Sequence, residues 1–198
     1  MSLLLFLIIF IAIVILIPYI RFLFKRLSMS KKIKSACTKL HYKFYKTSFF
    51  WIFGGRRMNK CDFYVETPTE VYAVKLFGMK KKTAELIFKQ NGEYFERHYL
   101  ALISNNGGGV RFPMEKKPKK LPDYDFRHRY RMEWEIKSPH NVLLINPVCR
   151  EIHRQVQHGV EKLLGAGDVV NGMEIYSLSR FLGELEKNDD LYSEFDRT

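Results

Sequence analysis

Carboxylates and a lysine able to take part in metal or acid–base chemistry gather in one short segment, at Asp62, Glu66, Glu70 and Lys75. Residues 62–66 and 70–77 are rich in Val, Tyr and Phe and are joined by Thr-Pro-Thr, which predicts a β-hairpin. Strand alternation puts Asp62 and Glu66 on one face, about 13 Å apart at ~3.3 Å per residue, and Glu70 and Lys75 on opposite faces.

The two runs resemble the metal-binding hairpin of the PD-(D/E)xK restriction-endonuclease-like superfamily, including its nuclease-related and Mrr-like members. The resemblance implies that an aspartate opening the second strand and a Glu-x-Lys on the third converge at one sheet edge. Two carboxylates would hold Mg²⁺ there, and the lysine would assist the attacking water. Asp62 and Lys75 match this pattern, whereas Ala73 stands where the second carboxylate belongs.

The loss of a carboxylate at Ala73 weakens such a site, since Mg²⁺ is usually held by one or two carboxylates plus water and phosphate. The resemblance therefore favours a catalytically degenerate nuclease-like domain that binds or scaffolds, without a cofactor. The alternative is a membrane-tethered Mg²⁺-dependent nuclease. It would use Asp62 and Lys75 as catalytic residues and Asp62 and Glu66 as metal ligands.

Other chemistries have weaker support in the sequence. The glycines at 107–109 and 165–167 lack the Lys-Ser/Thr of a phosphate-binding loop. His153 and His158 are five residues apart, which in a helix separates them by about 140° and makes a poor metal pair. Cys149 follows an apolar run and has no residue nearby in sequence to orient it as a nucleophile, so we interpret it as a packing residue.

The N-terminus carries the clearest pattern in the chain. Residues 3–17 are an unbroken apolar run, and no charge appears before Arg21. At ~1.5 Å per residue, residues 3–20 give a helix of about 27 Å, close to the roughly 30 Å of a bilayer core. A secretory signal peptide would need a basic residue before the run and a small-residue cleavage site after it, and neither is present. We therefore expect a single-pass transmembrane anchor.

Basic residues follow the anchor. Residues 21–60 hold 12 Lys and Arg and no acidic residue, while the 33 basic residues of the whole chain leave 21 for residues 61–198, against 21 acidic ones. Lys and Arg beside a span mark its cytoplasmic side and attract anionic lipid. We expect membrane localisation with the C-terminal domain in the cytoplasm, anionic lipid and an unidentified protein as partners, and nucleic acid as a less favoured partner. The membrane-proximal basic residues are Arg21, Lys25, Arg26, Lys31, Lys32 and Lys34.

The expected fold is α/β, with an N-terminal transmembrane helix and one domain whose central mixed β-sheet is flanked by helices in a nuclease-like topology. The expected parts are an anchor at 1–24, a basic membrane-proximal helix and strand at 25–60, the rest of the domain at 61–188, and a frayed tail at 189–198. Helices are predicted at 28–40 and from about 178, a buried strand at 141–146, and an exposed loop at 105–122. Three widely spaced cysteines suit a reducing compartment. The aromatic run at 49–53 is expected in the core, with the membrane interface as the alternative.

Overall fold

The computed structural model is an α/β structure whose described part contains two helices and two mixed β-sheets. It describes the backbone of residues 2–46, 61–79, 82–103, 109–121, 139–146, 149–156 and 159–195. The aromatic run at residues 49–53, the basic run at residues 127–131 and His158 lie outside these ranges. The expected α/β class and mixed central sheet are confirmed.

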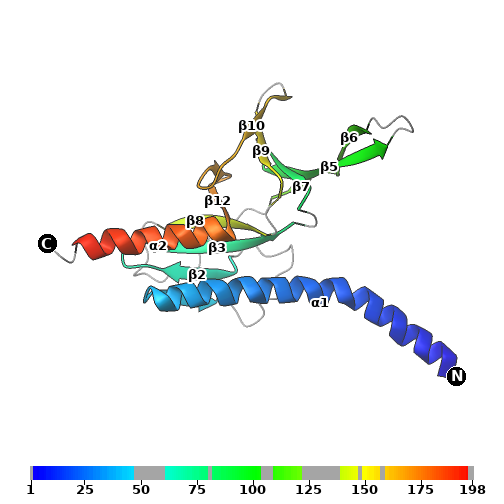
Figure 1. The fold of residues 1–198 in the computed structure, drawn as a ribbon, viewed down its shortest axis with the longest axis horizontal. Coiled ribbons are helices and arrows are strands. Elements are labelled where there is room, and N and C mark those ends of the chain that lie inside the picture. Colours follow the sequence, from blue (N-terminus) through cyan, green and yellow to red (C-terminus); the bar gives the residue numbers. More distant parts are fainter. Residues whose placement is uncertain are drawn as a thin grey trace.

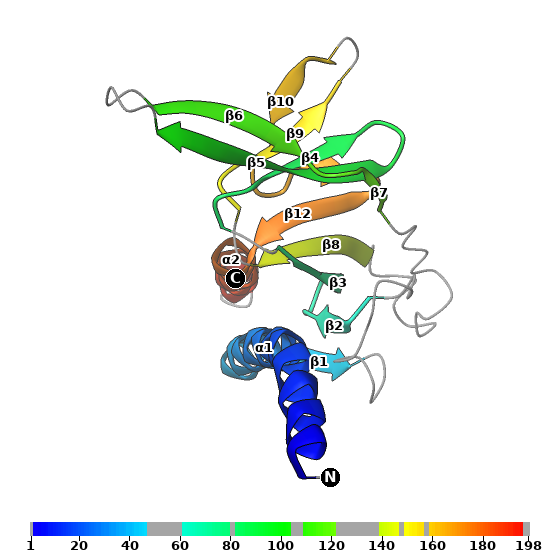
Figure 2. The ribbon, with the colours of Figure 1, turned by 90° about the vertical axis from the view of Figure 1, so that its right-hand side faces the viewer.

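The first sheet has the strand order β1-β2-β3-β8-β12-β11 and forms the middle layer of the molecule (Figure 2). Strands β3, β8 and β12 run parallel, and the outer pairs are antiparallel. The contiguous apolar residues Val142 to Ile145 place β8 at the centre, because both faces of this sheet are covered. The strands are β1 (Lys43–Lys46), β2 (Phe63–Glu66), β3 (Val71–Gly78), β8 (Pro139–Asn146), β11 (Val169–Val170) and β12 (Met173–Ser177).

The second sheet has the order β10-β9-β4-β5-β6, with the short β7 also paired to β5. Its β4–β5 hairpin turns at Gly92, whose φ of 77° is the left-handed conformation expected for the Asn-Gly turn. The strands are β4 (Glu85–Lys89), β5 (Glu93–Ile103), β6 (Gly109–Glu115), β7 (Lys119–Lys120), β9 (Ile152–Gln155) and β10 (Glu161–Leu163).

The expectation of an exposed loop at residues 105–122 is wrong over much of that range. Residues 109–115 form β6, which pairs antiparallel with β5 from Arg97↔Glu115 to Ile103↔Gly109. Pro113 lies opposite Tyr99 in this ladder. It is tolerated because β6 is an edge strand, where a missing N–H need not break a ladder bond.

Helix α1 spans Ser2–Lys39 without interruption. It runs beneath the first sheet and then bends away from the body toward the N-terminus (Figure 1). Pro18 lies within this helix, and proline kinks helices because it lacks an N–H. The helix expected at residues 28–40 is therefore one part of a longer helix that also includes the apolar run.

Within the part of the chain described down to its side chains, no helix is long and apolar enough to cross a membrane. Most of the apolar run, residues 3–13 and 15, lies outside that part.

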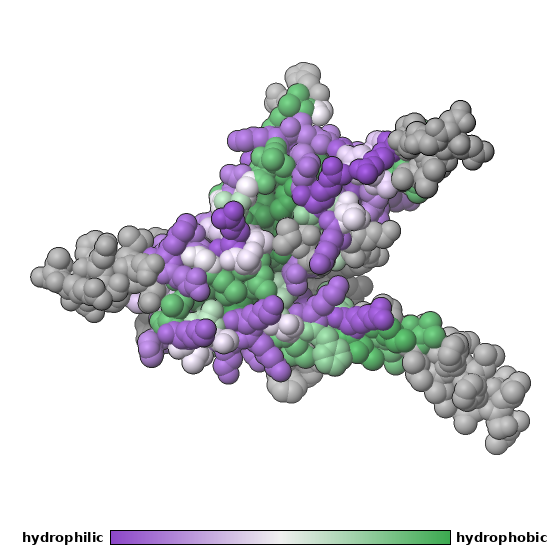
Figure 3. Space-filling model, viewed as in Figure 1, coloured by the Kyte–Doolittle hydropathy of each residue, from purple (hydrophilic) through white to green (hydrophobic). Residues whose placement is uncertain are grey.

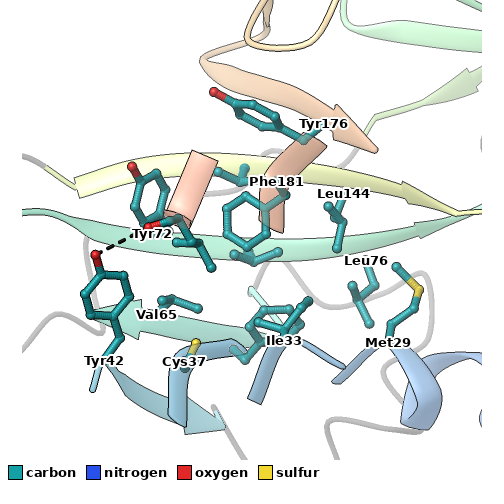
Figure 4. Packing of buried hydrophobic residues seen from close by; sticks show 14 residues of the cluster. Met29, Ile33, Cys37, Tyr42, Val65, Tyr72, Leu76, Leu144, Tyr176 and Phe181 are labelled. Carbon is teal, nitrogen blue, oxygen red and sulfur yellow. Dashed lines mark hydrogen bonds between the residues drawn. The ribbon is translucent and has the colours of Figure 1, made fainter. Parts of the chain in front are cut away.

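Helix α2 (Leu178–Phe195) begins where β12 ends, with the Ser177 hydroxyl accepting the Arg180 backbone N–H at 3.3 Å. It packs beside α1 on one face of the first sheet, where Phe181 and Leu185 are fully buried. Ile33 of α1 joins this cluster, and Tyr42 donates a hydrogen bond to the Leu185 carbonyl (Figure 4). The second sheet covers the other face through a separate apolar cluster. The molecule thus has three layers: two helices, the first sheet and the second sheet.

Candidate functional site

The predicted hairpin of β2 and β3 brings Asp62 and Lys75 together. Its turn is closed by Thr67, whose N–H and hydroxyl both donate to the Glu70 carbonyl. The register pairs Phe63 with Val74, and the Asp62 N–H donates to the Val74 carbonyl at 2.8 Å. Asp62 therefore comes next to Lys75, and the Lys75 Nζ lies 3.5 Å from the Asp62 Oδ1.

A third charged residue, Arg26 of α1, completes this group. Its Nη2 lies 2.5 Å from the Asp62 Oδ1, and the Leu76 N–H donates to the Asp62 Oδ2 at 2.7 Å. The side chains of Arg26, Asp62 and Lys75 are 5%, 3% and 8% exposed. We call these three residues the buried triad.

The buried triad holds two cationic side chains and one carboxylate in a water-poor setting. Burial lowers the pKa of Lys75, which the negative charge of Asp62 opposes and the positive charge of Arg26 reinforces. Buried charges need partners, and here one carboxylate serves both cations. The arrangement is therefore that of a structural ion cluster.

The residues at this position do not fit a magnesium ion. Mg²⁺ requires near-octahedral oxygen coordination with several water ligands. Asp62 is 2% exposed and already accepts from a guanidinium and a backbone N–H. Ala73, which lies on the same strand face as Lys75, is fully buried among Cys61, Tyr64 and Val71 and offers no oxygen.

The second expected metal ligand, Glu66, is not brought to Asp62. It ends β2, the strand that Asp62 precedes, so about four strand residues, or roughly 13 Å, separate the two. Glu66 accepts a hydrogen bond from the Tyr45 hydroxyl at 3.1 Å and lies 3.7 Å from the Lys43 Nζ. Its carboxylate belongs to the β1–β2 pair.

Two other polar clusters were not found by sequence reasoning. The first joins the starts of β3, β8 and β12, where His140 Nδ1 lies 2.7 Å from Glu174 Oε1 and His140 Nε2 lies 3.6 Å from Glu70 Oε1. Tyr72 also donates to Glu70, and Asn188 of α2 donates to both. Its members are far apart in sequence, so only strand order could have indicated it.

The second cluster lies on the second sheet. Glu85, Glu151 and His153 place one ligand atom each within 4.8 Å of one another, the only such group of three in the described residues. Buried Glu85 already accepts from the Tyr99 hydroxyl at 3.0 Å and lies 3.6 Å from the Arg97 guanidinium. The buried carboxylate of this cluster is therefore already held by a hydroxyl and a cation.

Five of the six membrane-proximal basic residues are exposed on α1, and Arg26 is the exception because it is buried in the triad. Exposed apolar residues lie between Val14 and Phe24 on the same helix, and Figure 3 shows hydrophobic residues gathered on the part of α1 that leaves the body. The exposed apolar residues of α1 are Val14, Leu16, Ile17, Tyr19, Ile20, Phe22 and Phe24.

No family model, curated protein or solved structure matches this chain.

Proposed function

We propose that this protein is a membrane-anchored binding or scaffold protein whose cytoplasmic domain is a catalytically degenerate relative of the nuclease fold. The observation that carries the proposal is the buried triad. The Asp62 carboxylate, which an active relative would offer to Mg²⁺, instead contacts both Arg26 and Lys75 in a buried position.

The nuclease-like part of the proposal is supported by chain order. A helix is followed by the antiparallel strands β1, β2 and β3, and β8 then adds parallel to β3. Asp62 and Lys75 lie at the neighbouring positions that the resemblance implies. The alternative, a Mg²⁺-dependent nuclease, is disfavoured because neither Ala73 nor Glu66 supplies a second carboxylate beside Asp62.

The membrane part is supported by the composition of α1. The uncharged run at residues 3–20 belongs to the same helix as Arg26 and Ile33, which pack into the domain. Exposed Lys25, Lys31 and Lys32 follow that run and suit the anionic cytoplasmic face of a bilayer.

The experiment titrates Mg²⁺ and Mn²⁺ into the full chain in phosphatidylcholine nanodiscs by calorimetry, with DNA and RNA cleavage assays on the same sample. We expect neither saturable metal binding nor cleavage. Metal-dependent cleavage that Lys75→Met abolishes in a folded protein would establish the nuclease instead. Lys75→Met is preferred to Asp62→Ala because it leaves the Arg26–Asp62 pair in place.

The topology is tested separately. The chain should stay with the membrane after alkaline extraction, and a reporter fused after Thr198 should be active only in the cytoplasm. Release at alkaline pH, or an active reporter on the outer side, would contradict the proposed anchor or its orientation.

A further inference from the structure

The β5–β6 hairpin is a long projection with an exposed apolar face. Successive residue pairs of the hairpin alternate between its two faces, and Arg97↔Glu115 and Tyr99↔Pro113 lie on the same one. On one face Leu100 pairs with Phe112 and His98 pairs with Met114. Leu100, Phe112 and Met114 are 49%, 49% and 55% exposed, which is high for large apolar side chains.

The polarity of this face changes from its base to its tip. At the base, Glu96 accepts from the Lys116 ammonium at 2.6 Å. Beyond it come the apolar pairs, and the sequence has no acidic residue between Arg97 and Met114. Exposed Arg111 lies on the opposite face, next to Phe112. An exposed apolar end beside exposed Arg111, in a segment whose sequence has no acidic residue, matches a lipid interface with anionic headgroups.

The opposite face of the hairpin is held to the sheet by charge. Arg97 contacts Glu115 of β6 at 2.9 Å and Glu161 of β10 at 2.5 Å. These contacts fix the base of the hairpin on the face opposite to Leu100, Phe112 and Met114. Figure 1 shows the hairpin projecting toward the same side of the molecule as the N-terminal end of α1.

We infer that the apolar face of the β5–β6 hairpin, formed by Leu100, Phe112 and Met114, is a second contact with the anionic bilayer that holds α1. The inference rests on the proposed membrane anchor. Two separated contacts fix how the domain is oriented on the membrane. A single helix would leave the domain free to rotate about the helix axis. Arg111 pairs with lipid phosphates while the apolar side chains enter the headgroup–acyl boundary.

The test places a nitroxide label on single cysteines introduced into the full chain in vesicles of phosphatidylcholine and phosphatidylglycerol. The native Cys37, Cys61 and Cys149 are buried and should not take the label. Phe112→Cys and Met114→Cys report on the apolar face, and Pro113→Cys on the opposite one. Leu163→Cys is the matched control, because Leu163 is an apolar residue 60% exposed on β10, away from the hairpin tip.

The expected result is that oxygen collides with labels at 112 and 114 more often than a water-soluble nickel chelate does. The ratio of oxygen collisions to nickel-chelate collisions should be lower at 113, and at 163 the nickel chelate should collide more often than oxygen.

Alkaline extraction of the same sample separates the two proposals. If the chain stays in the vesicles and label 112 is as open to nickel as label 163, the hairpin contact is overturned and the anchor stands. If the chain is extracted, both are overturned. Spin–spin broadening at 112 that disappears on dilution with unlabelled chain would identify a second copy as the occupant and overturn the lipid contact.

Discussion

The Nη2 of Arg26 lies 2.5 Å from the Oδ1 of Asp62, and this pair joins the helix that carries the apolar run to the hairpin that resembles a nuclease site. Arg26 lies only six residues beyond Ile20, the last residue of the uncharged stretch. From Arg26 onward, one side of α1 is core, including Met29, Ile33 and Cys37. The apolar run and the domain therefore share one uninterrupted helix without an intervening linker.

The charge balance of the triad predicts unequal effects of its three substitutions. Asp62→Asn removes the carboxylate charge that contacts both buried cations and should lower the free energy of unfolding by about 3–5 kcal/mol. Lys75→Met leaves the Arg26–Asp62 pair neutral and should cost less than about 1.5 kcal/mol, because removing a buried charge of lowered pKa offsets the lost contact. Chemical denaturation of both variants in the same detergent measures the difference, and equal losses would contradict this account.

Substitutions at two neighbouring residues of α1 test how much this helix contributes to the hydrophobic core. Ile33 is fully buried between α1 and the first sheet, so Ile33→Ala should destabilise the protein by about 2–5 kcal/mol. Lys32 is exposed, and Lys32→Ala should change stability by no more than about 0.5 kcal/mol. Thermal unfolding followed by circular dichroism compares the two. A small effect at both positions would mean that the domain folds independently of α1.

The hairpin could be predicted from sequence because its signals are local. The composition of residues 62–66 and 70–77 predicts the two strands, and the resemblance implies that Asp62 and Lys75 converge, as the register and the 3.5 Å contact show. Arg26 could not be predicted as their partner, because it lies 36 residues before Asp62 and is part of a basic run that suggests a solvated surface. Composition alone gives no means of telling a buried arginine from its exposed neighbours.

The second sheet was missed in part for a different reason. Pro113 and the glycines at 107–109 are turn formers, so residues 105–122 were interpreted as a loop. The pairing of β6 depends on the length of β5 and on cross-strand apolar contacts such as Leu100↔Phe112, which are tertiary features. The Glu70–His140–Glu174 cluster likewise depends on three parallel strands starting at one edge.

The Arg97–Glu161 pair predicts how stability depends on pH. Hydrogen bonds from Arg97 hold the pKa of Glu161 below its usual value of 4.5, more than burial raises it. The folded pKa is below the unfolded one, so the pair stabilises the protein fully above about pH 4.5 and progressively less as the pH falls toward the folded pKa. Glu161→Gln should cost about 1.5 kcal/mol at pH 7 and little below the folded pKa. Denaturation curves from pH 3 to pH 7 measure this, and a difference that does not shrink with acid would contradict it.

Thiol reactivity gives a last prediction about the core. Burial raises the pKa of Cys37 to about 12 and that of Cys149 to about 11, so almost no thiolate forms at pH 8. Cys61 is also buried, with 2% of its surface exposed. The thiols of the folded chain should therefore react with a disulfide reagent at least about a hundredfold more slowly than free cysteine. After unfolding in guanidinium, all three thiols should become reactive. Reaction of one thiol at the free-cysteine rate would show that the core beside it opens readily. For Cys37, that would mean that α1 separates readily from the first sheet.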